Sequence, residues 1–180
     1  AGVSVNSTAQ CEQYPDGTTP LHISAAANRL QLAQALIAAG ANVNIQNVKG
    51  QTALLMSCMD RHEQIIRLLL DSGADATIAT NDGCTPLIML GEPIPGEPGL
   101  PANDWKRDAN LCVLFLAAGV KVTSRDTDGM TALMSAARHG HFELAEALIY
   151  FGKAPVNAQD NEGKSAVTYA IEGIVGIREE

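Results

Sequence analysis

Apolar residues recur along the chain in sets of four, at positions i, i+1, i+4 and i+5, a spacing that lies on one stripe of a helix. The sets are Leu32, Ala33, Leu36 and Ile37; Ile65, Ile66, Leu69 and Leu70; and Leu144, Ala145, Leu148 and Ile149. A glycine suited to a left-handed C-cap follows each set, and a fourth such glycine lies in the third unit. These glycines are Gly40, Gly73, Gly119 and Gly152. The pattern predicts four helices that end near these positions.

A second column of glycines marks the start of each unit, in turn sequences such as Asp16-Gly17 and Asp128-Gly129. Its members are Gly17, Gly50, Gly83, Gly129 and Gly163, at intervals of 33, 33, 46 and 34 residues. The C-cap glycines are spaced by 33, 46 and 33 residues. Two columns therefore share a 33-residue period, with 13 residues inserted in the third unit.

A hydroxyl residue stands two positions after each turn glycine, where it can cap the first N–H groups of a helix. These residues are Thr19, Thr52, Thr85, Thr131 and Ser165. Pro20 and Pro86 follow directly, at the first helical position, where proline is tolerated. We expect a first helix from about Pro20 to Ala27, with equivalents in the other units.

The segment Asp16–Asn44, DGTTPLHISAAANRLQLAQALIAAGANVN, resembles the ankyrin-repeat pattern, as do GQTALLMSCMDRHEQIIRLLLDSGAD and DGMTALMSAARHGHFELAEALI. The resemblance covers about Asp16 to Ile171. It implies an all-α solenoid of stacked helix-turn-helix units with β-hairpin-like finger loops. Its usual activity is non-catalytic protein–protein binding on a concave face formed by the fingers and first helices. Only His22 keeps the histidine of the family pattern, and the loop after Gly152 is one residue longer than usual.

We expect one ankyrin-repeat domain over residues 1–180. Its predicted parts are an N-terminal cap or linker (1–15), repeats 16–48, 49–81, 82–127 and 128–161, and a partial capping repeat (162–180). The third repeat carries a Pro-rich insertion at about 90–108, which contains Trp105. Four prolines within nine residues exclude a helix there and favour an extended path. Two interpretations stay open: the loop contributes to partner binding, or it is a tolerated loop whose tryptophan packs back on the helices.

Composition narrows the partner class. The chain of 180 residues has 12 Lys+Arg and 20 Asp+Glu, a net charge of −8, with one Trp, three Tyr and three Phe. It lacks the basic surface and stacking rings of a nucleic-acid binder, and no apolar run approaches the ~18 residues of a membrane span. A basic protein or peptide partner is favoured, mainly through its rate of encounter. The domain itself is expected to be monomeric.

Localisation is predicted from the cysteines and from the start of the chain. Residues Ala1–Gln10 show no secretory signal pattern. Four widely spaced cysteines indicate thiols in a reducing compartment, and we expect a cytoplasmic protein.

The candidate partner-binding residues are those at finger tips, near the ends of first helices and in the insertion. They are Val48, Lys49, Gln51, Met59, Asp60, Asn81, Asp82, Cys84, Trp105, Thr127, Asp128, Met130, Arg138, His139, Asn161, Glu162 and Lys164. Val48, Met59 and Met130 are apolar anchors within a polar rim, or apolar finger residues that the fold merely tolerates. The alternative function is a structural spacer or self-association unit within a larger protein.

Candidate chemistry is sparse. His62 and His141 share one repeat column, where the family uses histidine to tie the loop between helices, and further metal ligands at suitable spacing are missing. We expect no metal, no cofactor and no catalytic residue, since nucleophile and phosphate-loop motifs are absent from the sequence. Cys58 is expected to be buried and Cys84 exposed. Asn44 is read as a turn residue, with hydroxylation as the open alternative.

Overall fold

The computed structural model describes residues 4–11, 14–94 and 105–176. It divides into two compact units, Ala1–Asn81 (unit 1) and Asp82–Glu180 (unit 2), and each is described by itself. The elements of unit 1 are β1 (Ala9–Cys11), β2 (Tyr14–Thr18), α1 (Pro20–Ala26), α2 (Leu30–Ala38), α3 (Ala53–Met59) and α4 (Glu63–Asp71). Those of unit 2 are α5 (Pro86–Met89), α6 (Trp105–Ala117), α7 (Ala132–Arg138), α8 (Phe142–Tyr150) and α9 (Ala166–Gly176). The single domain over residues 1–180 stays a prediction.

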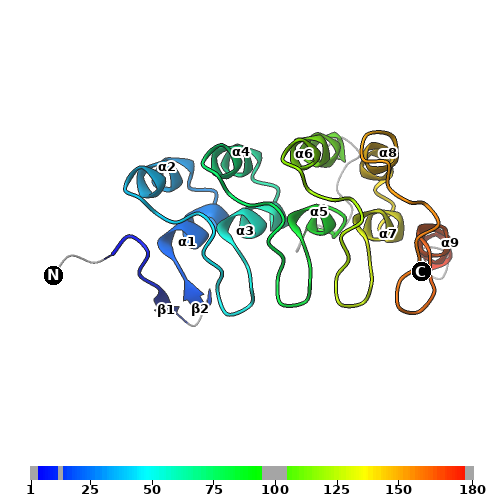
Figure 1. Ribbon diagram of the computed structural model, residues 1–180, viewed down its shortest axis with the longest axis horizontal. Helices are drawn as coiled ribbons and strands as arrows, with labels where there is room; N and C mark the ends of the chain where they lie inside the picture. Colours follow the sequence, from blue (N-terminus) through cyan, green and yellow to red (C-terminus); the bar gives the residue numbers. More distant parts are fainter. Residues whose placement is uncertain (1–3, 12–13, 95–104, 177–180) are drawn as a thin grey trace. The chain divides into compact units, whose positions relative to one another are not determined.

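The all-α class expected from the sequence is confirmed, because the helices of each unit pair into two layers. In unit 1, α1 and α3 form one layer and α2 and α4 the other (Figure 1). In unit 2, α5 and α7 lie in the first-helix layer and α6 packs on α8, while α9 packs on α7. Because one helix pair cannot bury its apolar stripe alone, each pair depends on its neighbours for a core.

The first helices begin at the hydroxyl caps that the sequence predicts. The side chains of Thr19, Thr52, Thr85 and Thr131 each accept a hydrogen bond from the backbone N–H three residues on. Pro20 and Pro86 occupy the first turns of α1 and α5. A cap of this kind is worth about 1 kcal/mol, so each helix start is set locally by its own sequence.

The second repeat fills the core of unit 1 with aliphatic side chains. Leu54, Leu55, Ile65, Ile66 and Leu69 are fully buried. The first repeat fits its predicted stripe less well, since Leu32 is exposed and Leu36 and Ile37 are half-buried. The physical reason is that, among the described residues, α2 has a second-helix neighbour on one side only, which is α4.

The third repeat departs from the others at both of its helices. Helix α5 has four residues, whereas α1, α3 and α7 have seven. Helix α6 has 13 residues and begins at Trp105, inside the span predicted as insertion. The loop expected over 90–108 therefore ends earlier, because WKRDANLCVLFLA holds no proline and continues the apolar stripe of the second helix. The extended path predicted for residues 95–104 lies outside the described residues.

The fourth repeat shifts its helix stop by one residue. Gly40, Gly73 and Gly119 adopt φ of 85° or 86°, as expected for left-handed caps. Gly152 does not, and Lys153 takes the positive φ instead. A Cβ at Gly152 would lie 2.7 Å from the carbonyl oxygen of Leu148, so this glycine is needed for close approach and not for its φ. The extra residue of this loop accounts for the shift.

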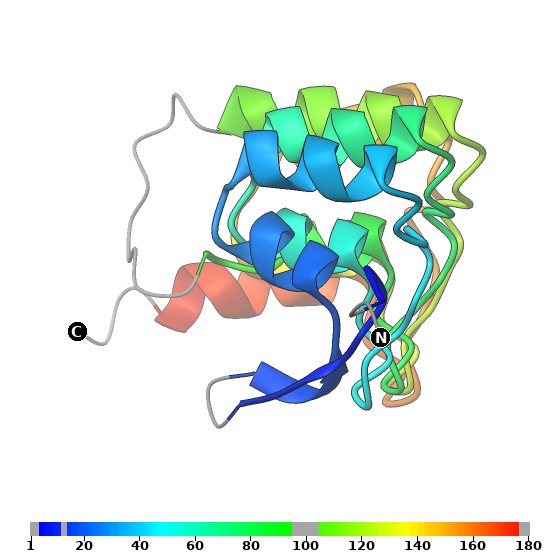
Figure 2. The ribbon, with the colours of Figure 1, turned by 90° about the vertical axis from the view of Figure 1, so that its left-hand side faces the viewer.

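The N-terminal segment, predicted as a cap or linker, forms a β-hairpin. Strands β1 and β2 pair antiparallel, with Ala9 opposite Thr18 and Cys11 opposite Tyr14. The hairpin extends from the start of α1, away from α2 (Figure 2). The Asn6 side chain accepts a hydrogen bond from the backbone N–H of Asn42 at 2.9 Å, which ties the segment to the loop after α2. The strand propensity of this short segment is weak, so the sequence did not predict the pairing.

Candidate functional site

The finger loops are held open by one repeated turn. Its acceptor is the residue three positions before Gly50, Gly129 or Gly163. In unit 1, Asn47 Oδ1 accepts from the N–H groups of Lys49 and Gln51, both at 3.0 Å. Asp126 and Asp160 repeat this turn in unit 2. Each turn glycine has a positive φ, which a residue without Cβ adopts at no steric cost. Local hydrogen bonds therefore fix the conformation of these three finger tips.

Neighbouring fingers within a unit are joined through their backbones. The N–H of Asn81 donates to Lys49 O at 3.1 Å in unit 1, and the N–H of Asn161 donates to Asp128 O at 3.0 Å in unit 2. The side-chain amide of Asn161 also donates to Thr127 O at 2.8 Å. These bonds place the tips in a row beside the first helices, on what we call the finger face.

In unit 2 the finger face contains a polar hollow of about 430 Å³ between two fingers, α7 and α9. It is lined by Asp128, Met130, Arg138, Asp160, Asn161, Glu162, Lys164, Tyr169 and Glu172. Six of these nine residues were predicted from the sequence as partner-binding. The hollow thus brings together residues around two successive finger turns, whose glycines Gly129 and Gly163 are 34 positions apart.

Charge in this hollow is organised around Tyr169. Its hydroxyl donates to Asp160 Oδ2 at 2.6 Å, which raises the pKa of Tyr169 to about 12 and lowers that of Asp160. Lys164 Nζ lies 5.6 Å above the ring and pairs with Glu172 Oε1 at 3.2 Å. This contact with Glu172 raises the pKa of Lys164. Four carboxylates face two cations, so the lining is net acidic.

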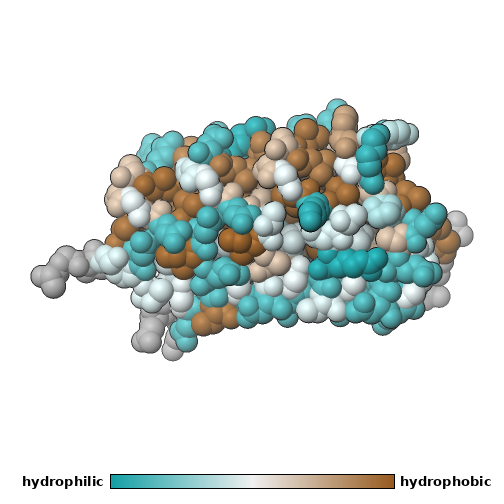
Figure 3. Space-filling model, in the orientation of Figure 1, coloured by the Kyte–Doolittle hydropathy of each residue, from teal (hydrophilic) through white to brown (hydrophobic). Residues whose placement is uncertain are grey.

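Unit 1 presents an exposed apolar finger residue between polar ones. Val48 is 60% exposed. Lys49, the next residue, and Asp60, which follows α3, are exposed too. Met59 is half-buried, and its sulfur lies 3.9 Å from the side-chain nitrogen of Gln51. Across both units, apolar surface gathers over the second helices, whereas the finger and first-helix rows are mainly polar (Figure 3). Val48 is therefore an apolar point on a polar face.

Several predicted exposures are wrong. Met130 is only 8% exposed, because its side chain packs beneath the hollow that it lines. Cys84 is half-buried and not exposed, and burial together with Glu92 raises its thiol pKa to about 12. Trp105 begins α6, and its side chain lies outside the described residues. The anchor role predicted for Met130 is thus reduced to shaping the wall.

The remaining predicted positions differ in their exposure to solvent. Asn81, Asp82, Thr127, Asp128, Arg138, Asn161 and Glu162 are exposed, while Gln51, His139 and Lys164 are half-buried. His139 Nδ1 lies 3.0 Å from the carbonyl oxygen of Gly91, so this ring also holds the loop after α5.

Three residues of the hollow were missed by sequence reasoning: Asp160, Tyr169 and Glu172. Glu172 occupies the same repeat column as Arg138 and Met59, so extending that column into the fifth repeat would have found it. Asp160 aligns with Asn47 as the turn acceptor. Tyr169 carried no signal, since its column is otherwise occupied by helix-core residues such as Met56.

The histidines and Asn44 have structural roles. His62 Nε2 lies 3.0 Å from Ala26 O and ties the end of α1 to the start of α4, as the resemblance implied. Asn44 Oδ1 accepts from the N–H of Asp75 at 2.8 Å, which links two consecutive repeats. Cys58 is buried as expected. Within residues 4–11, 14–94 and 105–176, no group of three or more His, Cys, Asp or Glu side chains is placed to hold a metal ion.

Comparison with known proteins agrees with this geometry. The family model for ankyrin repeats (3 copies) matches residues 21–90 and 103–178. The chain is 28% identical to a probable E3 ubiquitin-protein ligase of Oryza sativa subsp. japonica, over 74% of this chain and 31% of that protein. It is 28% identical to SH3 and multiple ankyrin repeat domains protein 2 of Homo sapiens, over 84% of this chain and 8% of that protein.

A 2-5A-dependent ribonuclease of Homo sapiens is 32% identical over 79% of this chain and 23% of its own length. The chain thus spans less than a third of these three relatives. Among the described helices, none has the length and apolar character needed to cross a membrane.

Proposed function

Because the chain belongs to the ankyrin-repeat family, we propose that it is a non-catalytic module that binds a protein or peptide partner on its finger face. Ankyrin repeats are generally protein–protein interaction modules. The observation that carries the proposal is the polar hollow of unit 2, where six independently predicted residues converge. The family model matches the repeats of this chain, and the proposal takes over none of the enzymatic activities named for the relatives.

The partner segment that best fits this hollow is basic. The lining has four carboxylates and two cations, and unit 2 has 14 acidic and 8 basic residues, a net charge of −6. Asp128 stands exposed at a finger tip and makes no ion pair with the described residues. Long-range attraction of this kind acts mainly on the association rate and weakens with salt. We further propose that the module is monomeric and cytoplasmic.

The test compares two lysine substitutions that change the charge equally on different faces. Asp128→Lys alters the finger face, and Asp71→Lys alters the exposed end of α4. Partners captured from a cell extract by the full chain are quantified by mass spectrometry. Loss of the same partners with Asp128→Lys, but not with Asp71→Lys, supports the proposal. Equal capture by both variants contradicts it.

A spacer or self-association unit is the second candidate, favoured by the outer surface of α9. Val167 and Ile171 lie one turn apart and are both exposed. Apolar surface at the end of a repeat array is a place where another copy or another domain can pack. Light scattering after size exclusion distinguishes the two: a stable dimer that Val167→Ser/Ile171→Ser returns to monomer favours this second function.

A further inference from the structure

The end of α8 exposes two aromatic rings that the repeat does not need. Tyr150 is 65% exposed and Phe151 is 69% exposed. The equivalent pairs in the first three repeats are Ala38-Ala39, Asp71-Ser72 and Ala117-Ala118. Three repeats therefore complete the same helix end with small or polar residues, so the aromatic pair is not required for the local fold. Two exposed rings at the end of a helix indicate an interaction surface.

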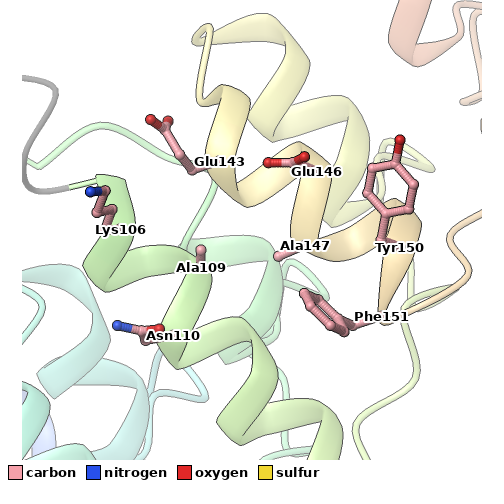
Figure 4. Close-up of a pocket in the computed structure, with 8 residues that line it drawn as sticks. All are labelled: Lys106, Ala109, Asn110, Glu143, Glu146, Ala147, Tyr150 and Phe151. Atoms are coloured by element: carbon pink, nitrogen blue, oxygen red, sulfur yellow. The ribbon is translucent and has the colours of Figure 1, made fainter.

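Beside these rings, a hollow of about 660 Å³ lies along the line where α6 and α8 meet, on the second-helix side of unit 2. Its floor is made by Ala109 and Ala147, which face each other, and the Phe151 ring extends toward it from α8 (Figure 4). Ala147 stands where the second and third repeats have leucine, and Ala109 stands where the fourth repeat has phenylalanine. The hollow exists because both positions carry the smallest apolar side chain.

The rim of this hollow is charged. Glu143 and Glu146 line it from α8, and Lys106 lines it from the start of α6. Oxygen Oε2 of Glu143 is shielded from solvent and accepts no hydrogen bond from any residue that the structure describes. A shielded carboxylate without a donor is costly unless a partner supplies one. The excess of two carboxylates over one ammonium favours a cationic ligand.

We propose that this hollow is a second docking site, for a partner-protein segment that presents an apolar side chain next to a lysine or arginine. The apolar side chain enters between Ala109 and Ala147 and packs on Phe151. The cation of its neighbour lies at the rim, where it donates to the exposed carboxylate of Glu146 and is attracted by the charge of Glu143. A volume of 660 Å³ is within the range of ligand sites of about 300–1,000 Å³. The site is on the opposite helix layer from the finger face and goes beyond the function proposed above.

The test selects a phage-displayed library of random 12-residue peptides on the immobilised full chain. The expected peptides combine an aliphatic or aromatic residue with Lys or Arg one or two positions away. The affinity of a synthetic, fluorescently labelled version is then measured for a set of variants. Tyr150→Ala/Phe151→Ala restores the alanine pair of the first and third repeats, so it preserves folding and lowers affinity about tenfold or more.

Two charge variants and one control sharpen the result. Glu146→Gln removes a negative charge from the rim, so it weakens binding of the cationic peptide and reduces the dependence of that binding on salt. Lys106→Ala removes a positive charge from the rim, so it strengthens binding. Val48→Ser on the finger face leaves the affinity unchanged. The proposed function is tested separately, by the loss of captured partners with Asp128→Lys.

Four outcomes overturn the proposal. Selected peptides that are acidic, or that bind Tyr150→Ala/Phe151→Ala as tightly as the parent chain, exclude the assigned chemistry. A chain that dimerises in light scattering, and becomes monomeric in the same variant, shows that a second copy occupies the hollow. Co-sedimentation with phosphatidylcholine and phosphatidylserine vesicles that depends on Phe151 shows that the rings insert into lipid.

Discussion

His22 joins the first helix of one repeat to the finger of the next, since its Nε2 atom lies 3.0 Å from the carbonyl oxygen of Gln51. Its Nδ1 atom accepts from the backbone N–H of Thr19 at 3.1 Å. With Nδ1 as the acceptor, Nε2 carries the proton that is donated to Gln51. If Nδ1 were protonated, its N–H would point at the backbone N–H of Thr19, so that two donors would face each other.

This arrangement predicts a dependence of stability on pH. Burial lowers the pKa of His22 from its ordinary value of 6.5. As pH falls below 6.5, the unfolded chain binds a proton that the folded chain does not, so the free energy of unfolding decreases. Melting temperatures between pH 8 and pH 5 measure this loss. His22→Leu, which copies Leu55 of the next repeat, should flatten the acidic side of the curve, and an equally steep curve contradicts the assignment.

Burial predicts different costs for two equivalent leucines. Leu69 is fully buried and Leu36 is half-buried, although both occupy the same repeat column. Leu69→Ala should cost about 2–5 kcal/mol, the range for a buried deletion, and Leu36→Ala clearly less. Urea unfolding followed by circular dichroism gives both values. Equal losses would show that the two sites are packed alike.

Two glycines with similar backbone angles should respond differently to alanine. Gly50 has φ of 76° and Gly73 has φ of 85°, so both substitutions incur roughly 1–2 kcal/mol of left-handed strain. A Cβ at Gly50 would also lie 2.6 Å from the backbone nitrogen of Asn81, whereas one at Gly73 meets open space. Gly50→Ala should therefore lower the melting temperature more than Gly73→Ala does. If Gly73→Ala lowered the melting temperature more, the close approach of Gly50 to the backbone of Asn81 would be wrong.

Cys84 should be unreactive in the folded protein. Burial, followed by the carboxylates of Glu92, Asp126 and Asp82, raises its pKa from 9.0 to about 12. The raised pKa leaves a very small thiolate fraction at neutral pH, and the thiolate is the nucleophile. Iodoacetamide labelling at pH 7.5, followed by peptide mapping, should show slow modification of Cys84. The same labelling in 6 M urea is the control, and equal rates in both conditions would contradict the burial.

Much of the fold follows from local signals in the sequence. Thr52 caps its helix because a hydroxyl before an apolar stripe is the best acceptor for free N–H groups, and that is visible without coordinates. Gly83 takes its positive φ for an equally local reason. The site was predicted in part, since Asp128 stands at a repeat position that is exposed in every copy. Tyr169 was not predicted, because its role depends on how α9 folds back on the finger turn that holds Asp160.

The 33-residue period, the helix starts and the turn glycines were determined by the sequence alone, because each depends on contacts within a few residues. Only the tertiary structure decided which side chains are covered. Met130 is buried and Leu32 exposed, against the repeat pattern, because burial depends on the neighbour that packs on each helix. The hollow between α6 and α8 has the same origin, since two alanines 38 positions apart leave space only where their helices meet.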